Sequence, residues 1–112
     1  MKRRKLLQNG TEVSEVGLGC MSFAGFYGAT SEAEAHRTLA AALDMGVNFP
    51  DTANIYGMGV SEHVIGSFLK GDDTKLVIAT NGASWDNTAT GKPGIHNTPA
   101  HTRPEPGLLL TR

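Results

Sequence analysis

Apolar and polar positions alternate in short blocks over the first 80 residues, and these blocks predict three strands, two helices and a hairpin. Residues 4–16 predict the hairpin, because Asn9-Gly10 favours the tight turn between two antiparallel strands. The apolar run over 16–21 predicts a short buried strand, which is followed by a glycine-rich stretch.

The next block predicts a helix over 31–45. Ser31 is a good N-cap residue, and Glu34 completes a capping box three positions later. One apolar stripe follows at helical spacing, made of Ala35, Leu39, Ala42 and Leu43. Gly46 supplies the left-handed residue at which such a helix stops.

Three further elements follow the first helix. Residues 47–49 predict a short strand, 61–70 a second helix with one apolar face, and 75–80 a β-branched apolar strand. Alternation of strands and helices with short connections is typical of right-handed βαβ units in a parallel sheet. The sequence therefore predicts an α/β fold with about three parallel strands.

The pattern changes at residue 81. Residues 81–112 contain many Gly, Asn, Thr and Pro residues and have neither a helical nor a strand period. We therefore divide the chain into a folded part, 1–80, and a loop or disordered tail, 81–112.

Composition narrows the class of protein. The chain has 112 residues and a formal net charge of −1. Its basic cluster at 2–5 has no extended basic face behind it, so we expect a solvated tail and no nucleic-acid partner. No apolar run reaches the ~20 residues that a membrane span requires. The single cysteine, Cys20, excludes an intramolecular disulfide and favours a reducing, cytoplasmic location.

Candidate chemistry lies where the predicted strands end. Gly19-Cys20-Met21 follows the first strand, Asp51 and Tyr56 follow the second, and Asn81 follows the third. In parallel α/β folds this edge of the sheet binds ligands. Taken singly, Asp51 could equally cap a turn, and Tyr56 could be a packing aromatic residue with its hydroxyl in water.

Together these stretches resemble a known family. VSEVGLGCMSFAGFYG, ALDMGVNFPDTANIYG, SEHVIGSFLKG and KLVIAT are similar, in order and spacing, to the N-terminal third of an aldo-keto reductase. The resemblance covers about residues 4–103, and DTAxxYG at 51–57 is its most specific motif. It implies part of a (β/α)8 TIM barrel and an NADPH-dependent reduction of aldehydes or ketones, which are small-molecule carbonyl substrates.

The resemblance also implies roles for single residues. Tyr56 matches the family's proton donor, and Asp51 matches the aspartate that holds a neighbouring lysine and lies beside the cofactor. A phenol is a weak acid at neutral pH, and the family strengthens it with that lysine. Gly19, Cys20 and Met21 match the segment that touches the nicotinamide side of NADPH.

Several positions depart from the family pattern. Asn81 occupies the position of the catalytic lysine. The family's active-site histidine follows a fourth strand that we do not predict here, and His36 and His63 are expected on solvated helix faces. Pro50 removes a ladder donor, so the second strand is expected to be short or distorted. The family's C-terminal third, which holds the adenosine phosphate, has no counterpart.

Two hypotheses about function follow from these observations. The first is an aldo-keto reductase-like oxidoreductase represented by a truncated chain that is weakly active or inactive. The alternative is a non-catalytic fragment that associates with another chain, or with a second copy of itself, through open sheet edges.

Overall fold

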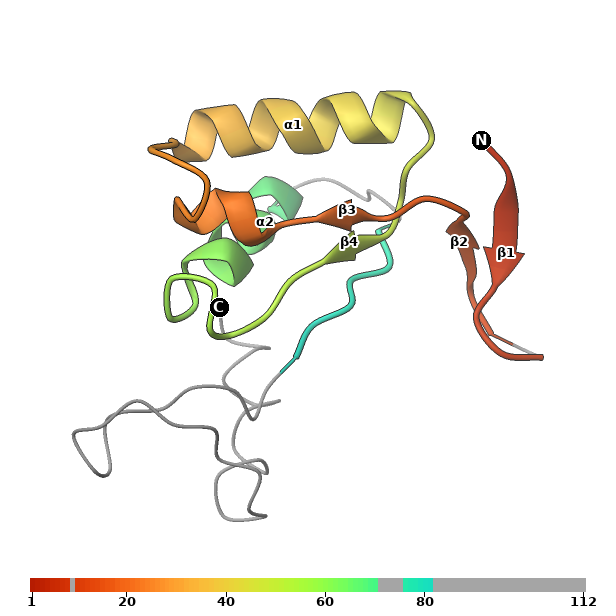
Figure 1. Cartoon of the computed structure of the whole chain (residues 1–112). Helices are drawn as coiled ribbons and strands as arrows, with labels where there is room; N and C mark the ends of the chain where they lie inside the picture. Colours follow the sequence, from red (N-terminus) through yellow and green to blue (C-terminus); the bar gives the residue numbers. More distant parts are fainter. Residues whose placement is uncertain (9, 71–75, 82–112) are drawn as a thin grey trace, which may run out of the picture.

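The N-terminal segment forms the predicted hairpin. The computed structural model describes residues 1–8, 10–70 and 76–81 (Figure 1). Strand β1 (Arg3–Lys5) pairs antiparallel with β2 (Glu12–Ser14). The hairpin is confirmed, although Asn9 of its turn lies outside the described residues.

A short parallel pair forms the centre of the fold. Strand β3 (Leu18–Gly19) pairs with β4 (Pro50–Asp51), in the register Leu18↔Pro50 and Gly19↔Asp51. The strand expected over 16–21 is therefore too long. Val16 is exposed, and Met21 already belongs to a 3-10 helix, η1 (Met21–Ala24).

The later strand predictions also need correction. The second strand is β4 and not 47–49, and 76–80 contains one parallel bridge, Asp51↔Ala79, in place of a full strand. Lys75 lies outside the described residues. Thr52 N–H donates to the carbonyl of Ala79 (2.8 Å), and Pro50, two residues earlier, has no N–H for the matching bond to Val77. The ladder is therefore interrupted at the proline, as its position in the sequence predicts.

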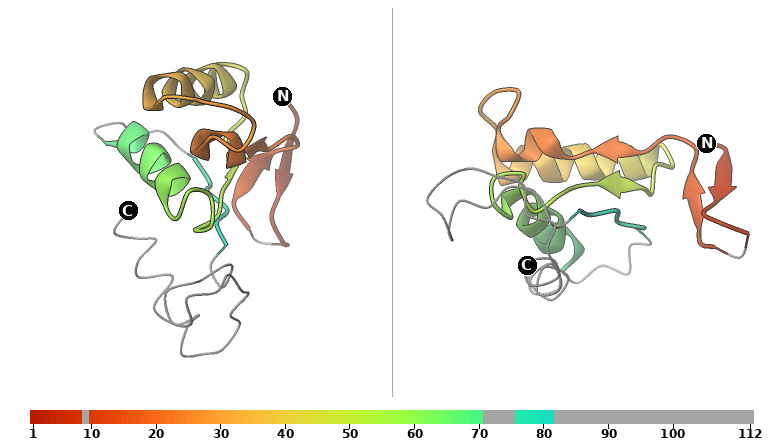
Figure 2. Two further views of the ribbon diagram at one scale, coloured as in Figure 1. Left: turned by 60° about the vertical axis from the view of Figure 1, so that its left-hand side comes forward. Right: turned by 60° about the horizontal axis from the view of Figure 1, so that its bottom comes forward.

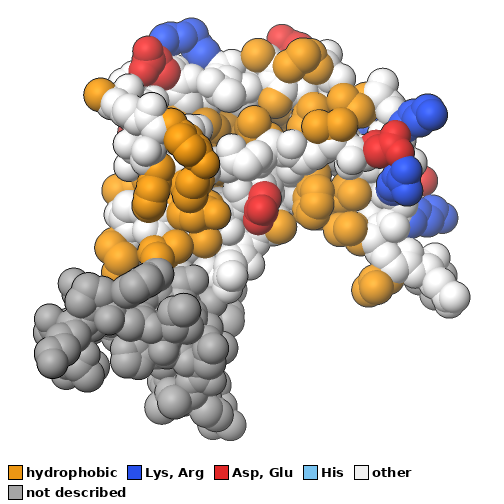
Figure 3. All heavy atoms as spheres, viewed as in Figure 1, with side chains coloured by type: hydrophobic (Ala, Val, Ile, Leu, Met, Phe, Trp, Pro, Cys, Tyr) orange, Lys and Arg blue, Asp and Glu red, His pale blue; other side chains and the backbone are white. Residues whose placement is uncertain are grey.

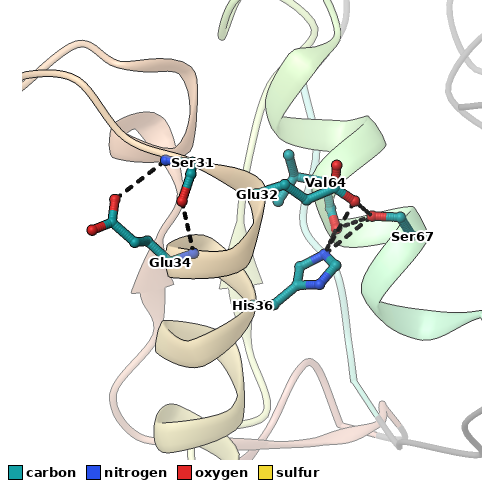
Figure 4. A network of polar contacts seen from close by, with 6 residues as sticks. All are labelled: Ser31, Glu32, Glu34, His36, Val64 and Ser67. Carbon is teal, nitrogen blue, oxygen red and sulfur yellow. Dashed lines mark hydrogen bonds and ion pairs between the residues drawn. The ribbon is translucent and has the colours of Figure 1, made fainter.

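Both helices occur close to their predicted positions. Helix α1 (Glu32–Asp44) begins with the predicted capping box, in which Ser31 Oγ accepts from the N–H of Glu34 at 3.2 Å (Figure 4). It is followed by Gly46 with φ 86°. Helix α2 (Val60–Leu69) begins one residue earlier than predicted.

The core lies between the parallel strands and the helices, which pack on the same side of β3 (Figures 1 and 2). Its buried members come from the β3 exit, η1 and both helices: Cys20, Phe23, Ala35, Leu39, Val64 and Ile65. The described segments alternate as strand, helix, strand, helix and a third, bridge-paired segment, with the helices on one face and no described helix on the other.

His36 differs from its predicted position in solvent. It lies between the helices, where its Nε2 is 3.0 Å from the carbonyl of Val64 and 3.1 Å from Ser67 Oγ (Figure 4). A carbonyl can only accept, so Nε2 carries a proton and donates it. Ser67 Oγ in turn donates to Glu32 Oε1. His63 is exposed, as expected.

The side chains of Asn48 and Ser14 attach the hairpin to the amino end of the β4 segment, and the N–H of Asn48 donates to Ser14 Oγ at 3.1 Å. Asn48 Oδ1 accepts from the N–H of Ser14 at 2.7 Å, and Asn48 Nδ2 donates to the carbonyl of Glu12 at 3.2 Å. The hairpin therefore lies at the end of the sheet opposite η1 (Figure 2). No helix within the described part of the chain is long and apolar enough to cross a membrane.

Candidate active site

The ends of the three parallel segments lie side by side. Cys20 N–H donates to the carbonyl of Asp51 at 2.9 Å, which joins the first exit to the second. Asn54 N–H donates to the carbonyl of Asn81 at 3.0 Å, which joins the second to the third. Asn81 is therefore in direct contact with the loop of residues 51–54, which we call the DTAN loop.

Asp51 lies on the uncovered face of the sheet. It lines an open cavity of about 580 Å³ together with Gly19, Phe49 and Ala79 of the parallel segments and with residues of the hairpin. Figure 3 shows hydrophobic side chains spread over this side of the molecule, with most of the Lys and Arg side chains at the hairpin end and another group at the upper left. The Asp51 carboxylate is thus an exposed charge on a largely apolar surface.

Tyr56 is half-buried and is not among the residues that line the Asp51 cavity. Its ring meets the edge of Phe26, with centroids 5.9 Å apart and planes at 69°. Such an edge-to-face pair restricts the orientation of the ring. The structure therefore brings Asp51 and Gly19 to one cavity and holds Tyr56 against the glycine-rich loop that follows η1.

The backbone after Tyr56 turns sharply into α2. Gly57, Met58 and Gly59 have φ values of 67°, 52° and 97°. A Cβ on Gly57 would lie 2.8 Å from the Cβ of Val60, which is too close. The glycine of the DTAxxYG motif is therefore required both by its backbone conformation and by the nearby start of the helix.

A chain of buried hydroxyl groups supports the DTAN loop. Thr52 Oγ1 donates to Ser61 Oγ at 2.8 Å, and Ser61 Oγ donates to the carbonyl of Cys20 at 2.9 Å. Thr52 and Ser61 are buried. These bonds connect the motif, the first turn of α2 and the exit of β3. Sequence reasoning missed both residues, because a serine at a helix start gives only the signal of a cap.

Cys20 is held inside the core. Its Sγ lies 3.4 Å from the carbonyl of Leu18, and its backbone N–H and carbonyl already bond to Asp51 and Ser61. Burial raises the pKa of the thiol to about 12, and the nearby negative charge of Asp51 contributes to the shift. The Cys20 side chain therefore stays neutral and does not reach the cavity surface.

Gly19 presents bare backbone at the end of β3. Apart from Gly19 itself and its two neighbours in the chain, no atom lies within 4 Å of the position where its Cβ would be. Among the described residues, neither its N–H nor its carbonyl has a hydrogen-bond partner. Of the three residues expected near a cofactor, Gly19 leaves room for a flat ring, whereas Met21 is half-buried in η1.

A buried carboxylate holds the third exit. Glu62 of α2 is 8% exposed and accepts a hydrogen bond from Thr80 Oγ1 at 2.7 Å. This contact fixes the backbone next to Asn81, whose side chain is exposed. Over the described ranges, no group of three or more His, Cys, Asp or Glu residues could hold a metal ion.

Comparison with known proteins identifies the family to which this chain belongs. The profile of the Aldo/keto reductase family matches residues 15–104, and the chain belongs to that family of oxidoreductases. Among curated relatives, it is 36% identical over 91 residues to the aldo-keto reductase YhdN of Bacillus subtilis, covering 78% of this chain and 28% of YhdN.

Another relative and a solved structure agree with this assignment. The chain is 32% identical over 102 residues to the Schizosaccharomyces pombe aldo-keto reductase yakc, whose name includes NADP(+), covering 89% of this chain and 30% of yakc. The holo structure of aldo-keto reductase AKR11C1 from Bacillus halodurans superposes with a TM-score of 0.80 at 30% identity, covering 99% of this chain and 36% of that one.

The expected fold class is confirmed by these comparisons. The structural neighbours are (β/α)8 barrels, and this chain matches part of one. It spans 28–30% of the length of YhdN and yakc.

Proposed function

We propose that these residues form the proton-donating part of an NADPH-dependent carbonyl reductase site, with Tyr56 as the acid. The observation that carries the proposal is the contact of the DTAN loop with position 81. This contact supports the proposal, because Asn54 lies between Asp51 and Tyr56 in the motif and Asn81 is the residue that we match to the family's lysine. The family match and the name of the yakc relative support NADP as the cofactor.

In this proposal each residue has one task. The Tyr56 hydroxyl donates a proton to the carbonyl oxygen of an aldehyde or ketone, and Phe26 restricts the phenol ring. Asp51 provides a negative charge on the cavity surface. Thr52 and Ser61 position the loop between Asp51 and Tyr56 through their buried hydrogen bonds.

The backbone of Gly19 is where a nicotinamide ring fits this chain best, because nothing occupies the space above its Cα. When bound, NADPH would supply a hydride to the carbonyl carbon. Cys20 would contribute by holding the end of β3 and not by touching the ring, since its thiol is buried in the core.

Asn81 limits this chemistry. A positive charge beside the phenol stabilises the phenolate left after proton transfer, and an amide has no charge to offer. We therefore propose that this 112-residue chain, assayed by itself, has little or no reductase activity.

NADPH consumption with an aromatic aldehyde tests this proposal. We expect a turnover far below the ~1–10³ per second of ordinary enzymes. The residual rate should fall further in Tyr56→Phe and stay unchanged in Tyr27→Phe, since Tyr27 is an exposed phenol of the neighbouring loop. Ordinary turnover in the unaltered chain would contradict the proposed low activity, and a measurable residual rate that Tyr56→Phe leaves unchanged would contradict the assignment of Tyr56 as the acid.

A second function is association with another chain through open sheet edges, including a second copy of this chain. The exposed Ile78, at 39%, is the observation that favours it. We also propose a cytoplasmic location, because the chain's single cysteine is a free, buried thiol and a reducing compartment keeps thiols in that state.

A further inference from the structure

The basic cluster near the start of the chain forms a paired strand. Its composition predicts a solvated tail, whereas in the structure Arg3–Lys5 form β1 of the hairpin. The pairing continues past β1, because Leu6 N–H donates to the carbonyl of Thr11 at 3.1 Å. Before β1, the carbonyl of Lys2 accepts from Glu15 N–H at 2.9 Å. The cations are therefore held on an ordered backbone, so a ligand that binds them has less of the chain to order.

Much of the positive charge on this strand is uncompensated. Four consecutive cations are exposed: Lys2, Arg3, Arg4 and Lys5. Arg4 forms an ion pair with Glu15, whereas the other three form none with any residue that the structure describes. Glu12, the second acidic residue of the hairpin, lies opposite Lys5. The hairpin therefore presents an excess of positive charge, and most of the Lys and Arg side chains in Figure 3 lie at this end.

Exposed leucine side chains follow directly after these cations. Leu6 is 39% exposed and Leu7 is 91% exposed. Leu7 also has a φ of 65°, a left-handed conformation that is unfavourable for any residue with a branched side chain. A leucine at this position therefore contributes neither buried surface nor a relaxed backbone to the fold. Strain of this kind in an exposed apolar residue points to a task outside the fold itself.

We propose that the hairpin binds an anionic lipid surface. Arg3 and Lys5, which share one face of β1, would contact the phosphate and carboxylate groups of the lipid heads. Leu7 would enter the boundary between these heads and the acyl chains. A basic cluster and an apolar anchor act together here, and neither alone gives firm attachment. This proposal is independent of both proposed functions, because it uses neither Tyr56 nor the edges of the parallel sheet.

A nucleic acid fits the same surface less well. Residues 1–16 contain no aromatic side chain on which a base could stack. A phosphodiester backbone would contact the cations, but it offers no apolar phase that would bury Leu7. The lipid surface alone uses both features of the hairpin, its charge and its exposed leucine.

Cosedimentation with lipid vesicles tests the proposal. The 112-residue chain is mixed with phosphatidylcholine vesicles that either contain or lack phosphatidylserine. We expect binding at least about tenfold tighter when phosphatidylserine is present, and we expect it to weaken as the salt concentration rises. Arg3→Gln/Lys5→Gln should bind these anionic vesicles about tenfold more weakly, because two charges near the surface are lost.

Leu7→Gly separates lipid insertion from an effect on folding. Glycine is favoured at a φ of 65°, so this variant should be at least as stable to urea as the unaltered chain. Loss of the leucine side chain should nevertheless weaken vesicle binding about tenfold. Met58→Gly is the matched control, because Met58 is 60% exposed, has a φ of 52° and precedes α2, which lies away from the hairpin in Figures 1 and 2. It should bind vesicles like the unaltered chain.

Three results would overturn the proposal. Equal binding to the two kinds of vesicle, or binding to neither, would show that the cations do not recognise anionic lipid heads. Unchanged vesicle binding by the folded Leu7→Gly variant would show that the hairpin tip does not enter the lipid. Tighter binding to a DNA oligonucleotide than to anionic vesicles at equal phosphate concentration would assign the basic strand to a nucleic acid instead.

Discussion

The buried hydroxyl chain makes a sharp prediction for Ser61→Ala. Ser61 is fully buried, accepts from Thr52 at 2.8 Å and donates to the Cys20 carbonyl at 2.9 Å. Its removal leaves the Thr52 hydroxyl buried without this partner. The Cys20 carbonyl retains the N–H of Phe23 at 3.1 Å. An orphaned buried hydroxyl costs ~1–3 kcal/mol and a lost hydrogen bond ~1 kcal/mol, so we expect destabilisation of about 2–3 kcal/mol.

The double variant provides the stringent test. Thr52→Val alone should cost about 1 kcal/mol, because Ser61 can still donate to Cys20. In Thr52→Val/Ser61→Ala no orphaned hydroxyl remains, so the double variant should be no less stable than Ser61→Ala. Thr30→Val, at an exposed position, should change stability by less than ~0.5 kcal/mol.

Urea unfolding followed by circular dichroism at the helical minimum measures these free energies. Two results would refute the reasoning. One is a loss below ~0.5 kcal/mol in Ser61→Ala, which would mean that water or a rearranged loop satisfies Thr52. The other is simple additivity of the single variants, which would mean that the two hydroxyl groups do not interact.

Three further predictions concern single groups. The hydrogen bond from Ser67 lowers the pKa of Glu32 below its ordinary value of 4.5. The stability that this carboxylate contributes is therefore present above pH 4.5 and is lost as the pH falls through the lowered pKa. Urea unfolding at pH values from ~3 to ~7 should show that Glu32→Gln loses less stability on acidification than the unaltered chain. The buried thiol of Cys20, with its pKa raised to about 12, should react with a thiol reagent at pH 8 only at the rate of unfolding, and fast reaction of the folded chain would contradict its burial. Gly57→Ala should cost about 1–3 kcal/mol in thermal unfolding, whereas Gly19→Ala, with open space at its Cβ, should cost far less.

Local signals predicted the helices well. The capping box at Ser31 and the left-handed Gly46 delimit α1 to within one residue of the prediction, because both act through neighbours in sequence. The parallel strands are shorter than their apolar runs suggested. Their length depends on pairing between segments far apart in the chain, and Pro50 interrupts that pairing in a way that hydrophobicity does not reveal.

The candidate site was likewise predictable where the signal is local and not where it depends on contacts far apart in the sequence. Asp51, Gly19 and position 81 could be placed from the motif and from the rule that parallel strands end at one edge. The Ser61 bond to Cys20 spans 41 residues of sequence, and nothing local to either residue signals it. His36 was misplaced for the same reason, since its partners Val64 and Ser67 belong to the other helix.

Pro50 also determines from which end the third parallel segment separates from the β4 segment. Beyond the proline, the third segment is joined to the β4 loop by Thr52 and Asn54, and Thr80 adds its contact with Glu62. Before the proline, the N–H of Val77 donates to the carbonyl of Asn48, but Pro50 has no N–H to donate to the carbonyl of Val77. A pulling force or a thermal fluctuation should therefore peel this segment away from its amino end first. The end that carries Asn81 should separate last, so position 81 is the better-held end of the segment.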